Sequence, residues 1–206
     1  MSESVTVAGI PFRLGWDGAP AGVVGADGTL EVAAGADSDM IIDPGGPSHR
    51  MNVPRLIGDP PAGDFQLSAK VAVELASTFD AGAIILFLDR RHWAKLLLER
   101  SVAGEATVVS VITRGVSDDC DSFTTAESHI WLRVSRLGEA FAFHASLDGR
   151  SWRFVRYFSF TCDHGPAEGA ARIGFEAQSP TGEGCIARFS EISFVAERLA
   201  DMRSGV

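Results

Sequence analysis

The sequence predicts an all-β protein built as a sandwich of two antiparallel sheets. Short segments recur along the chain in which apolar and polar residues alternate, or in which nearly every residue is apolar. Turn signals separate these segments, and none keeps a sustained 3.6-residue hydrophobic period. Because the 206 residues contain no evident linker, internal repeat or charge run, we expect a single domain over residues 1–206.

The first third of the chain contains a hairpin signal and a predicted loop. Asp27 and Gly28 lie between two short apolar runs, and an Asp-Gly pair readily adopts the positive φ values of a type I′ turn. Residues 37–43 enclose one more short strand. Residues 44–63 are rich in proline and glycine, which disfavour both a helix and a central strand, so a long surface loop is expected there.

The densest strand signals lie between residues 65 and 114. Residues 65–75 alternate with a period of two, whereas residues 83–88 are apolar at every position, as in a strand covered on both faces. In the next run, Trp93, Lys95 and Glu99 alternate with the apolar residues at positions 94, 96 and 98. These three side chains should therefore point away from the core. Residues 107–114 form a further β-branched run.

The last part of the chain predicts a loop, a meander and two closing strands. Residues 115–128 are polar and too irregular to predict as a paired strand. Three β-forming runs at 131–135, 141–146 and 152–160, with turns near Gly138 and at Asp148-Gly149, predict three consecutive antiparallel strands. Residues 171–178 and 185–195 complete the series. The remaining tail has room for one helical turn.

Charge and cysteine usage exclude some classes of partner. A formal net charge of -9 opposes attraction to a nucleic-acid backbone, which needs clustered Lys and Arg. There is no uncharged apolar run of about 18 residues to span a bilayer, and the N-terminal residues lack a secretory signal. The cysteines at positions 120, 162 and 185 form no CxxC pair, which suits reduced thiols. We expect a cytoplasmic protein without nucleic-acid or membrane partners.

With these elements in place, the chain resembles an uncharacterised family of the concanavalin A-like lectin and glucanase superfamily, one named after a regulation-of-enolase protein. The matching residues are Trp16, Gly28-Thr29-Leu30, residues 39–44, Gly63-Asp64-Phe65, Asp80-Ala81-Gly82, Trp93-Ala94-Lys95 with Glu99, residues 111–114 with Ser117 and Asp118, residues 146–149 with Trp152, Gly174, Ser179-Pro180 and Phe189. Asp119 and Ala81 depart from the pattern of such sequences. The resemblance implies a curved jelly-roll sandwich whose concave sheet binds ligands in many members, and it implies no settled activity.

The strand with Trp93, Lys95 and Glu99 is the candidate ligand-binding surface. An aromatic plane beside hydrogen-bonding groups suits a sugar, because the apolar face of the ring stacks while the hydroxyls need fixed partners. Arg114, Arg133 and His144 would join this face if the strands pair suitably, as would Ser146. The alternative without a ligand is a row of cross-strand charge pairs on a solvent-exposed sheet face. We expect a non-enzymatic domain that binds a saccharide or related polar ligand.

Two other functions stay open. A glycosidase would use Glu99 as general acid or nucleophile, but it needs a second carboxyl group. Only Glu176 and Asp89 present themselves for that role, without a motif to support either. A structural or protein-interaction module would instead use edge strands or the loop at residues 44–63.

The remaining polar motifs predict little chemistry. Cys162 and His164 have the spacing of an activated thiolate, but their surrounding turn favours solvated side chains. Asp118, Asp119 and Asp121 are oxygen donors without a calcium-loop spacing. His49 and Arg50 are candidates only for the rim of a pocket. No phosphate cradle, nucleophile elbow or zinc spacing occurs, so no metal or cofactor is expected.

Overall fold

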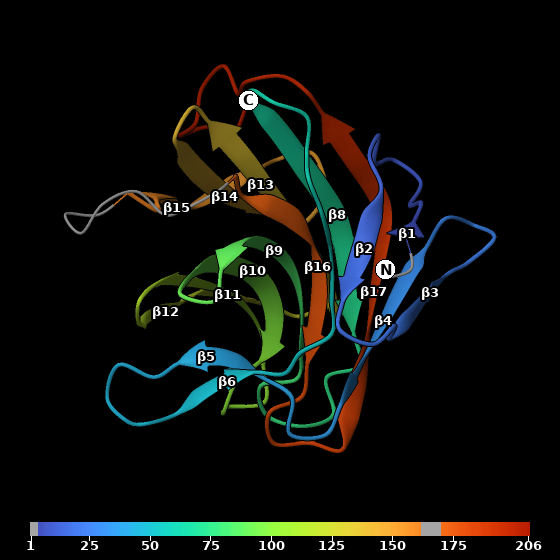
Figure 1. Ribbon diagram of the computed structural model, residues 1–206, viewed down its shortest axis with the longest axis vertical. Coiled ribbons are helices and arrows are strands. Elements are labelled where there is room, and N and C mark those ends of the chain that lie inside the picture. Colours follow the sequence, from blue (N-terminus) through green and yellow to red (C-terminus); the bar gives the residue numbers. More distant parts are fainter. Residues whose placement is uncertain (1–3, 162–169) are drawn as a thin grey trace.

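The protein is a sandwich of two antiparallel sheets, as predicted. The computed structural model describes residues 4–161 and 170–206 (Figure 1). Across the larger sheet the strands are β1 (Ser4–Val5), β2 (Leu14–Asp17), β7 (Arg55–Gly58), β16 (Arg172–Gln178), β9 (Ala81–Asp89), β10 (His92–Arg100), β11 (Ala106–Arg114) and β12 (Ser117–Thr125). Across the smaller sheet they are β15 (Arg153–Ser159), β14 (Ala140–Ser146), β13 (His129–Leu137), β8 (Phe65–Val73), β17 (Gly184–Val195), β4 (Leu30–Gly35) and β3 (Gly22–Val24). A separate hairpin is formed by β5 (Met40–Ile42) and β6 (His49–Met51).

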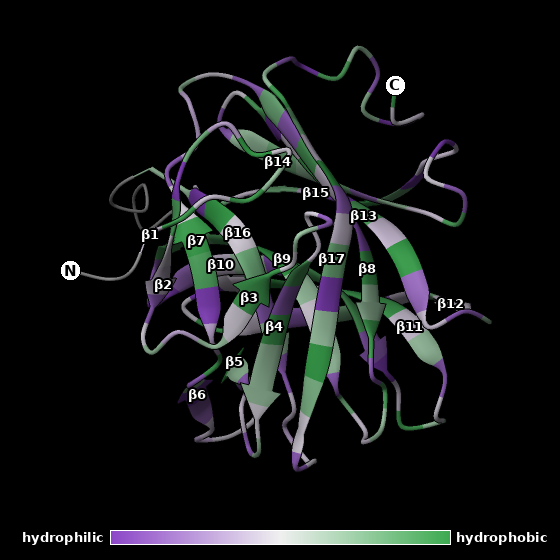
Figure 2. Ribbon diagram, turned by 90° about the vertical axis from the view of Figure 1, so that its right-hand side faces the viewer, coloured by the Kyte–Doolittle hydropathy of each residue, from purple (hydrophilic) through white to green (hydrophobic). Residues whose placement is uncertain are grey.

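The main core lies between the two sheets, and the period-two pattern of β8 shows how the sequence builds it. Buried and half-buried residues alternate along all of β8, so its apolar residues face the larger sheet while Gln66 and Lys70 face outward. Figure 2 shows the resulting alternation of hydrophobic and hydrophilic bands along strands such as β17. The aromatic pair Phe175 and Phe189 bridges the sheets with ring centroids 4.7 Å apart.

Strand β9 is apolar at nearly every position because both of its faces are covered. Ile84 and Leu86 belong to the main core, whereas Ala83 and Ile85 belong to a second apolar cluster on the opposite face. We call this opposite face of the eight-stranded sheet the outer face. Met40 from the β5–β6 hairpin belongs to the same cluster, and Figure 1 shows the hairpin next to β9–β12.

The predicted sidedness of residues 93–99 is confirmed. Ala94, Leu96 and Leu98 lie in the main core. Trp93 and Leu97 lie in the outer-face cluster, and the alternation of the strand puts Lys95 and Glu99 on that face as well. Strand β10 pairs with β9 on one side and with β11 on the other. Lys95 therefore lies between Ile85 of β9 and Val111 of β11 on the outer face.

The turn and meander predictions also hold. Gly28 connects β3 to β4 with a φ of 84°, which a residue without a Cβ adopts readily. Gly149 follows Asp148 with a φ of 71° in the turn between β14 and β15. Strands β13, β14 and β15 are neighbours in that order, as the three consecutive β-forming runs predicted.

Two local predictions were wrong. Residues 115–128 are not an unpaired loop, because they contain β12, which pairs with β11 through a bulge near Val108. Residues 44–63 contain β6 and β7, whose strands are too short to show a period in so proline-rich a segment. The tail contains a single turn at residues 201–205, closed by a 3.0 Å hydrogen bond from the N–H of Gly205 to the carbonyl of Asp201, in the place where one helical turn was expected. A helix long and apolar enough to cross a membrane is absent from the part of the chain described here.

Candidate functional site

A pocket of about 160 Å³ lies between the outer face and the β5–β6 hairpin. Its polar lining consists of Asp39, Lys95, Glu99, Asp119 and Gln178. These residues come from β10, β12, the end of β16 and the residue preceding β5. The apolar lining consists of Met40, Ile41, Phe79, Val111 and Pro180. The pocket thus combines convergent hydrogen-bonding groups with apolar contact surface, the usual composition of a small-molecule site.

Lys95 occupies the centre of the polar lining and is almost fully buried. Its Nζ donates a hydrogen bond of 2.5 Å to Oε1 of Gln178, across the intervening strand β9. The same Nζ lies 3.9 Å from a carboxylate oxygen of Glu176 and 4.0 Å from one of Asp39. Three groups therefore hold the Lys95 ammonium toward the β16 side of the pocket.

Glu99 lies four residues after Lys95 on the same face of β10 and is mostly buried. Its Oε2 accepts a hydrogen bond of 3.3 Å from Nε2 of Gln178. The pKa of Glu99 is raised to about 8, mainly by burial; Lys95 opposes this shift, whereas Asp119, Asp121 and Asp39 add to it. Glu99 is therefore largely protonated at neutral pH, which allows its carboxyl group to donate as well as accept a hydrogen bond.

Phe79 supplies an aromatic ring that the sequence did not single out. It is 38% exposed and lines the pocket. Its φ of 69° is unusual for a bulky residue. Buried Asp80 holds the preceding turn by accepting hydrogen bonds from the backbone N–H groups of Ala76 and Ser77. The carbonyl of Phe79 also accepts a hydrogen bond of 3.3 Å from Gln178, so the ring is held beside the polar groups.

Trp93 was expected to present an exposed ring, and this expectation was wrong. Its side chain is fully buried in the outer-face cluster. The segment that covers the cluster contributes Met40 and Val53, and the sequence of β10 alone carries no sign of that cover. The indole Nε1 has no hydrogen-bond partner in the structure. Trp93 thus supports the floor beside the pocket rather than lining it.

Arg133 and His144 do not share a face with Lys95, which corrects a second expectation. They are paired neighbours on β13 and β14 of the seven-stranded sheet. Both are buried beneath the tail of the chain. Arg133 Nη2 donates to the carbonyl of Gly205 at 2.5 Å, and His144 Nε2 lies 2.8 Å from the carbonyl of Met202. Their alternation resembled that of β10, but the strand order places them in the other sheet.

Arg114 and Ser146 also lie away from the pocket. Arg114 ends β11 and reaches across to the carbonyl of Ser159 in the other sheet, at 3.5 Å. It is paired with His92 and so follows the core-facing alternation of Ala94 and Ile112. Ser146 donates to Asp148 in the turn after β14. Of the expected ligand-binding residues, the structure brings only Lys95 and Glu99 to the pocket.

The two carboxyl groups proposed as partners of Glu99 have different positions. Asp89 accepts hydrogen bonds in the turn between β9 and β10, at the opposite end of those strands from Glu99. Glu176 lies on the outer face of β16 beside Lys95 and is fully buried, and neither of its oxygens has a hydrogen-bond partner among the described residues. Burial raises the pKa of Glu176, an effect that Lys95 and Arg55 partly oppose.

The aspartates of β12 divide between the two faces of the strand. Asp118 forms an ion pair of 2.7 Å with Arg156 of the other sheet. Asp119 is paired with Val111 and Asp121 with Val109, both outer-face residues. Loss of water around Asp119 raises its pKa, and Asp121 adds to the effect. No group of three or more metal-ligating side chains suited to an ion occurs within residues 4–161 and 170–206.

The other singled-out residues contribute nothing to this pocket. His49 and Arg50 are exposed on β6 and are not among its lining residues. Cys120 is exposed, and burial raises the pKa of the Cys185 thiol to about 12. Cys162, Asp163 and His164 lie outside the described residues.

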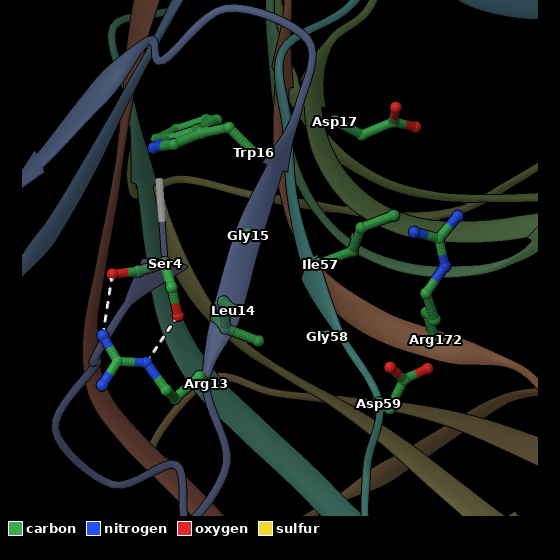
Figure 3. Close-up of a pocket in the computed structure, with 10 residues that line it drawn as sticks. All are labelled: Ser4, Arg13, Leu14, Gly15, Trp16, Asp17, Ile57, Gly58, Asp59 and Arg172. Atoms are coloured by element: carbon green, nitrogen blue, oxygen red, sulfur yellow. Dashed lines mark hydrogen bonds between the residues drawn. The ribbon is translucent and has the colours of Figure 1, made fainter. Parts of the chain in front are cut away.

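A more open depression lies at the other edge of the eight-stranded sheet (Figure 3). Arg13 is hydrogen-bonded to Ser4 on one side of β2, while Asp59 and Arg172 lie on the other side. Trp16 is buried and points away from Asp17. Because the backbone of β2 separates these side chains, they do not converge on a common point, and we consider the pocket at Lys95 the candidate site.

The fold is similar to those of several solved structures. A functionally unknown protein from Saccharomyces cerevisiae gives a TM-score of 0.78 at 24% identity, with 89% of this chain and 96% of that chain covered. The GH43 protein BlXynB from Bacillus licheniformis gives 0.67 at 15% identity, covering 82% of this chain and 33% of that one. A xylan beta-1,4-xylosidase from Bacillus halodurans C-125 gives 0.66 at 12% identity, with 81% and 32% covered. At these identities the likenesses show the fold alone, and they agree with the expected concanavalin A-like sandwich.

Two sequence comparisons complete this picture. No curated protein matches the sequence. A family model described as a protein of unknown function, DUF1349, matches residues 16–196. Since this match includes most of the chain, the protein belongs to the DUF1349 family.

Proposed function

We propose that the protein binds a saccharide or a related small polyhydroxylated ligand in the pocket at Lys95, without catalysing a reaction. The observation that carries this proposal is Phe79. A bulky residue in the left-handed backbone region costs about 1–3 kcal/mol, and here it places a half-exposed ring at the pocket mouth. Such a cost is typical of positions at which a side chain must be presented to a ligand.

The chemistry of the pocket suits a sugar ring. The apolar face of the ring would stack on Phe79, with Val111 and Ile41 completing the apolar contact. Gln178 already links Lys95, Glu99 and the Phe79 carbonyl, so its amide is fixed in orientation. Fixed donors and acceptors discriminate among hydroxyl positions because an unmatched buried polar group costs about 1–3 kcal/mol. Phe79 thereby takes the stacking role that was expected of Trp93.

A thermal-shift screen against a panel of mono- and oligosaccharides tests this proposal. We expect at least one sugar to raise the unfolding midpoint of the wild type and to have little effect on Phe79→Ala. Tyr157→Ala is the matched control, because Tyr157 is 49% exposed on β15 of the other sheet. If no sugar raises the midpoint, or if Phe79→Ala responds like the wild type, the proposal fails.

A glycoside-cleaving activity is the second candidate, favoured by the protonated state of Glu99. A carboxyl group with a pKa of about 8 can act as a general acid at neutral pH. Asp119 lines the same pocket and is a more accessible second carboxyl group than Glu176 or Asp89. Release of dye from aryl glycosides measures this activity. An activity that Glu99→Gln leaves unchanged would exclude Glu99 from the reaction.

Two finer assignments rest on the sequence. The reduced-thiol pattern of the cysteines supports a cytoplasmic location. The motifs around Trp93 and Asp148 support a closer relation to the family named after a regulation-of-enolase protein. Fractionation of the producing cell with an antibody against the protein tests the location, which a secreted fraction would contradict.

A further inference from the structure

We infer that the ligand of this pocket carries a protonated amine, so that a monosaccharide-sized amino sugar fits better than a neutral or acidic sugar. This inference rests on the proposed function and narrows its ligand class. It follows from the carboxyl groups that line the pocket, from the contacts that the nearby cations already make, and from the volume of the pocket.

The cations near the pocket are already engaged. Lys95 donates to Gln178 and lies within 4.0 Å of Glu176 and Asp39. Arg55 forms an ion pair of 2.8 Å with Asp17 and stacks on Phe87 at 4.9 Å. Both cations are therefore held by other groups, and Lys95 only partly offsets the carboxyl groups of Glu99 and Asp119.

Glu99 and Asp119 are the carboxyl groups left without a cation. Among the described residues, no Lys, Arg or His nitrogen lies within 4.0 Å of either. Glu99 accepts one hydrogen bond, from Gln178, which is itself neutral. Two carboxyl groups thus line the pocket without a cation within 4.0 Å, and Glu99 avoids a bare negative charge by keeping its proton.

Glu176 provides an independent sign that the site lacks positive charge. It is fully buried, its two oxygens have no hydrogen-bond partner, and its Oε1 points to Lys95 at 3.9 Å. The Lys95 ammonium is shared among Glu176, Asp39 and Gln178, so Glu176 has only part of its positive charge. A second ammonium group near Glu99 and Asp119 would compensate those two carboxyl groups, so that the charge of Lys95 would act mainly on Glu176.

An ammonium group also suits the geometry and size of the pocket. It has three donors, which correspond to the carboxyl groups of Glu99, Asp119 and Asp39 around the opening. A volume of about 160 Å³ is well below the range of about 300–1,000 Å³ that is usual for drug-sized ligands. The ligand is therefore no larger than about one sugar ring. An acidic sugar would bring a fourth carboxylate into this cluster and be repelled.

Amine binding should displace a proton from Glu99. The charged or polar groups facing Glu99 are Lys95 on the same strand, Gln178 on β16, Asp119 and Asp121 on β12, and Asp39 before β5. A bound ammonium favours the carboxylate form of Glu99 over the neutral acid. Near pH 7, binding should release up to one proton per ligand.

Isothermal titration calorimetry with D-glucosamine, D-glucose, N-acetyl-D-glucosamine and D-glucuronate tests the inference. We expect glucosamine to bind at least tenfold more tightly than the other three sugars. We also expect its apparent enthalpy at pH 7 to vary with the ionisation enthalpy of the buffer, as proton release requires. Glu99→Gln should abolish this buffer dependence, and Asp119→Asn should weaken glucosamine binding at least fivefold.

Asp118→Asn is the matched control, because Asp118 is next to Asp119 but faces Arg156 of the other sheet. It should bind glucosamine like the wild type. Equal binding of glucose and glucosamine would overturn the inference and leave saccharide binding intact. Glucosamine binding that survives both Glu99→Gln and Asp119→Asn would also overturn it. Failure of all four sugars, together with a negative saccharide screen, would overturn the proposed function itself. Circular dichroism of each variant confirms that it is folded.

Discussion

Nζ of Lys95 donates a 2.5 Å hydrogen bond to Oε1 of Gln178, joining β10 to β16 across the strand between them. The same ammonium is the closest positive charge to the buried carboxyl group of Glu176. Lys95 therefore has a larger stabilising effect on a charged Glu176 than Arg55 has, and its removal has a predictable cost.

Lys95→Met should lower the free energy of unfolding by about 3 kcal/mol, the lower end of the range for breaking a buried ion pair. The low end applies because Glu176 can take up a proton once its cation is gone. The loss should therefore grow as the pH rises. Urea denaturation at several pH values measures it. Lys70→Met is the control, since Lys70 is partly exposed and lies 3.9 Å from Glu191, and it should cost at most about 1 kcal/mol.

The double variant Lys95→Met with Glu176→Gln should be more stable than the sum of the two single changes predicts. Removing both charges leaves no buried ion without compensation. Additive effects would show that Lys95 and Glu176 are not coupled.

Glu99 should make the protein less stable as the pH rises. Its pKa is about 8 in the folded state and near its ordinary value of 4.5 in the unfolded chain. Between these values the folded state binds more protons, so the free energy of unfolding falls with increasing pH, by at most about 1.4 kcal/mol per pH unit for one group. Stability from this group is complete below about pH 4.5 and is lost progressively up to about pH 8.

Glu99→Gln removes this contribution, and the comparison isolates it from other titrating groups. We expect the variant to gain stability relative to the wild type as the pH is raised from 5 to 8. Chemical denaturation at each pH gives the difference. Parallel pH profiles for the two proteins would contradict a raised pKa at Glu99.

Trp93 should be required for stability rather than for direct ligand contact. Trp93→Ala removes a fully buried indole and should cost about 3–5 kcal/mol. Trp93→Phe keeps most of the apolar contact and removes an N–H that has no partner, so it should cost less than about 1.5 kcal/mol. Ligand binding by Trp93→Phe should remain near that of the wild type. Loss of binding in a fully folded Trp93→Phe would show that the indole contributes to the site.

Gly205→Ala should loosen the tail that covers Arg133 and His144. Gly205 has a φ of 76°, and an added Cβ would lie 2.7 Å from Cβ of Trp152 and 2.9 Å from Nη2 of Arg133. Gly138→Ala is the control, because Gly138 has a φ of 66° and an added Cβ would meet no atom within 4 Å. In both variants alanine must adopt a positive φ, so the strain from that backbone conformation is common to the two and cancels in the comparison.

The difference between these two variants should be about 1–3 kcal/mol, the cost of overpacking. Thermal and urea denaturation measure it, and faster hydrogen exchange at residues 199–206 should accompany it in Gly205→Ala alone. Equal destabilisation would mean that the tail adapts without loss of its contacts to Arg133 and His144.

The local pattern of the sequence predicted the sandwich and the two faces of β10 because both depend on alternation within one strand. It did not predict the burial of Trp93, because that depends on Met40 from the distant β5–β6 hairpin and on Val53 from the segment that follows it. Arg133 and His144 have the same kind of alternation as Lys95 but belong to another sheet. Strand order depends on contacts between segments far apart in the chain, and no local period encodes it.

The site residues that were missed share this cause. Gln178 and Asp39 reach the pocket through the pairing of β16 with β9 and through the position of the hairpin. Phe79 would have been recognisable only from its backbone conformation, since an isolated Phe in a polar turn is common. The pocket is therefore a product of tertiary arrangement more than of any motif.

The β5–β6 hairpin determines how a larger molecule would approach this protein. One side of the pocket is formed by the hairpin residues Met40 and Ile41 and by Asp39, which precedes them. The N–H of Ile42 donates a 2.9 Å hydrogen bond to Oγ of Ser117 in β12. A polysaccharide laid along the sheet would collide with this wall. Only the terminal sugar of a polysaccharide, or a free monosaccharide, would reach Glu99. Binding would therefore depend on the number of chain ends and not on the length of each chain.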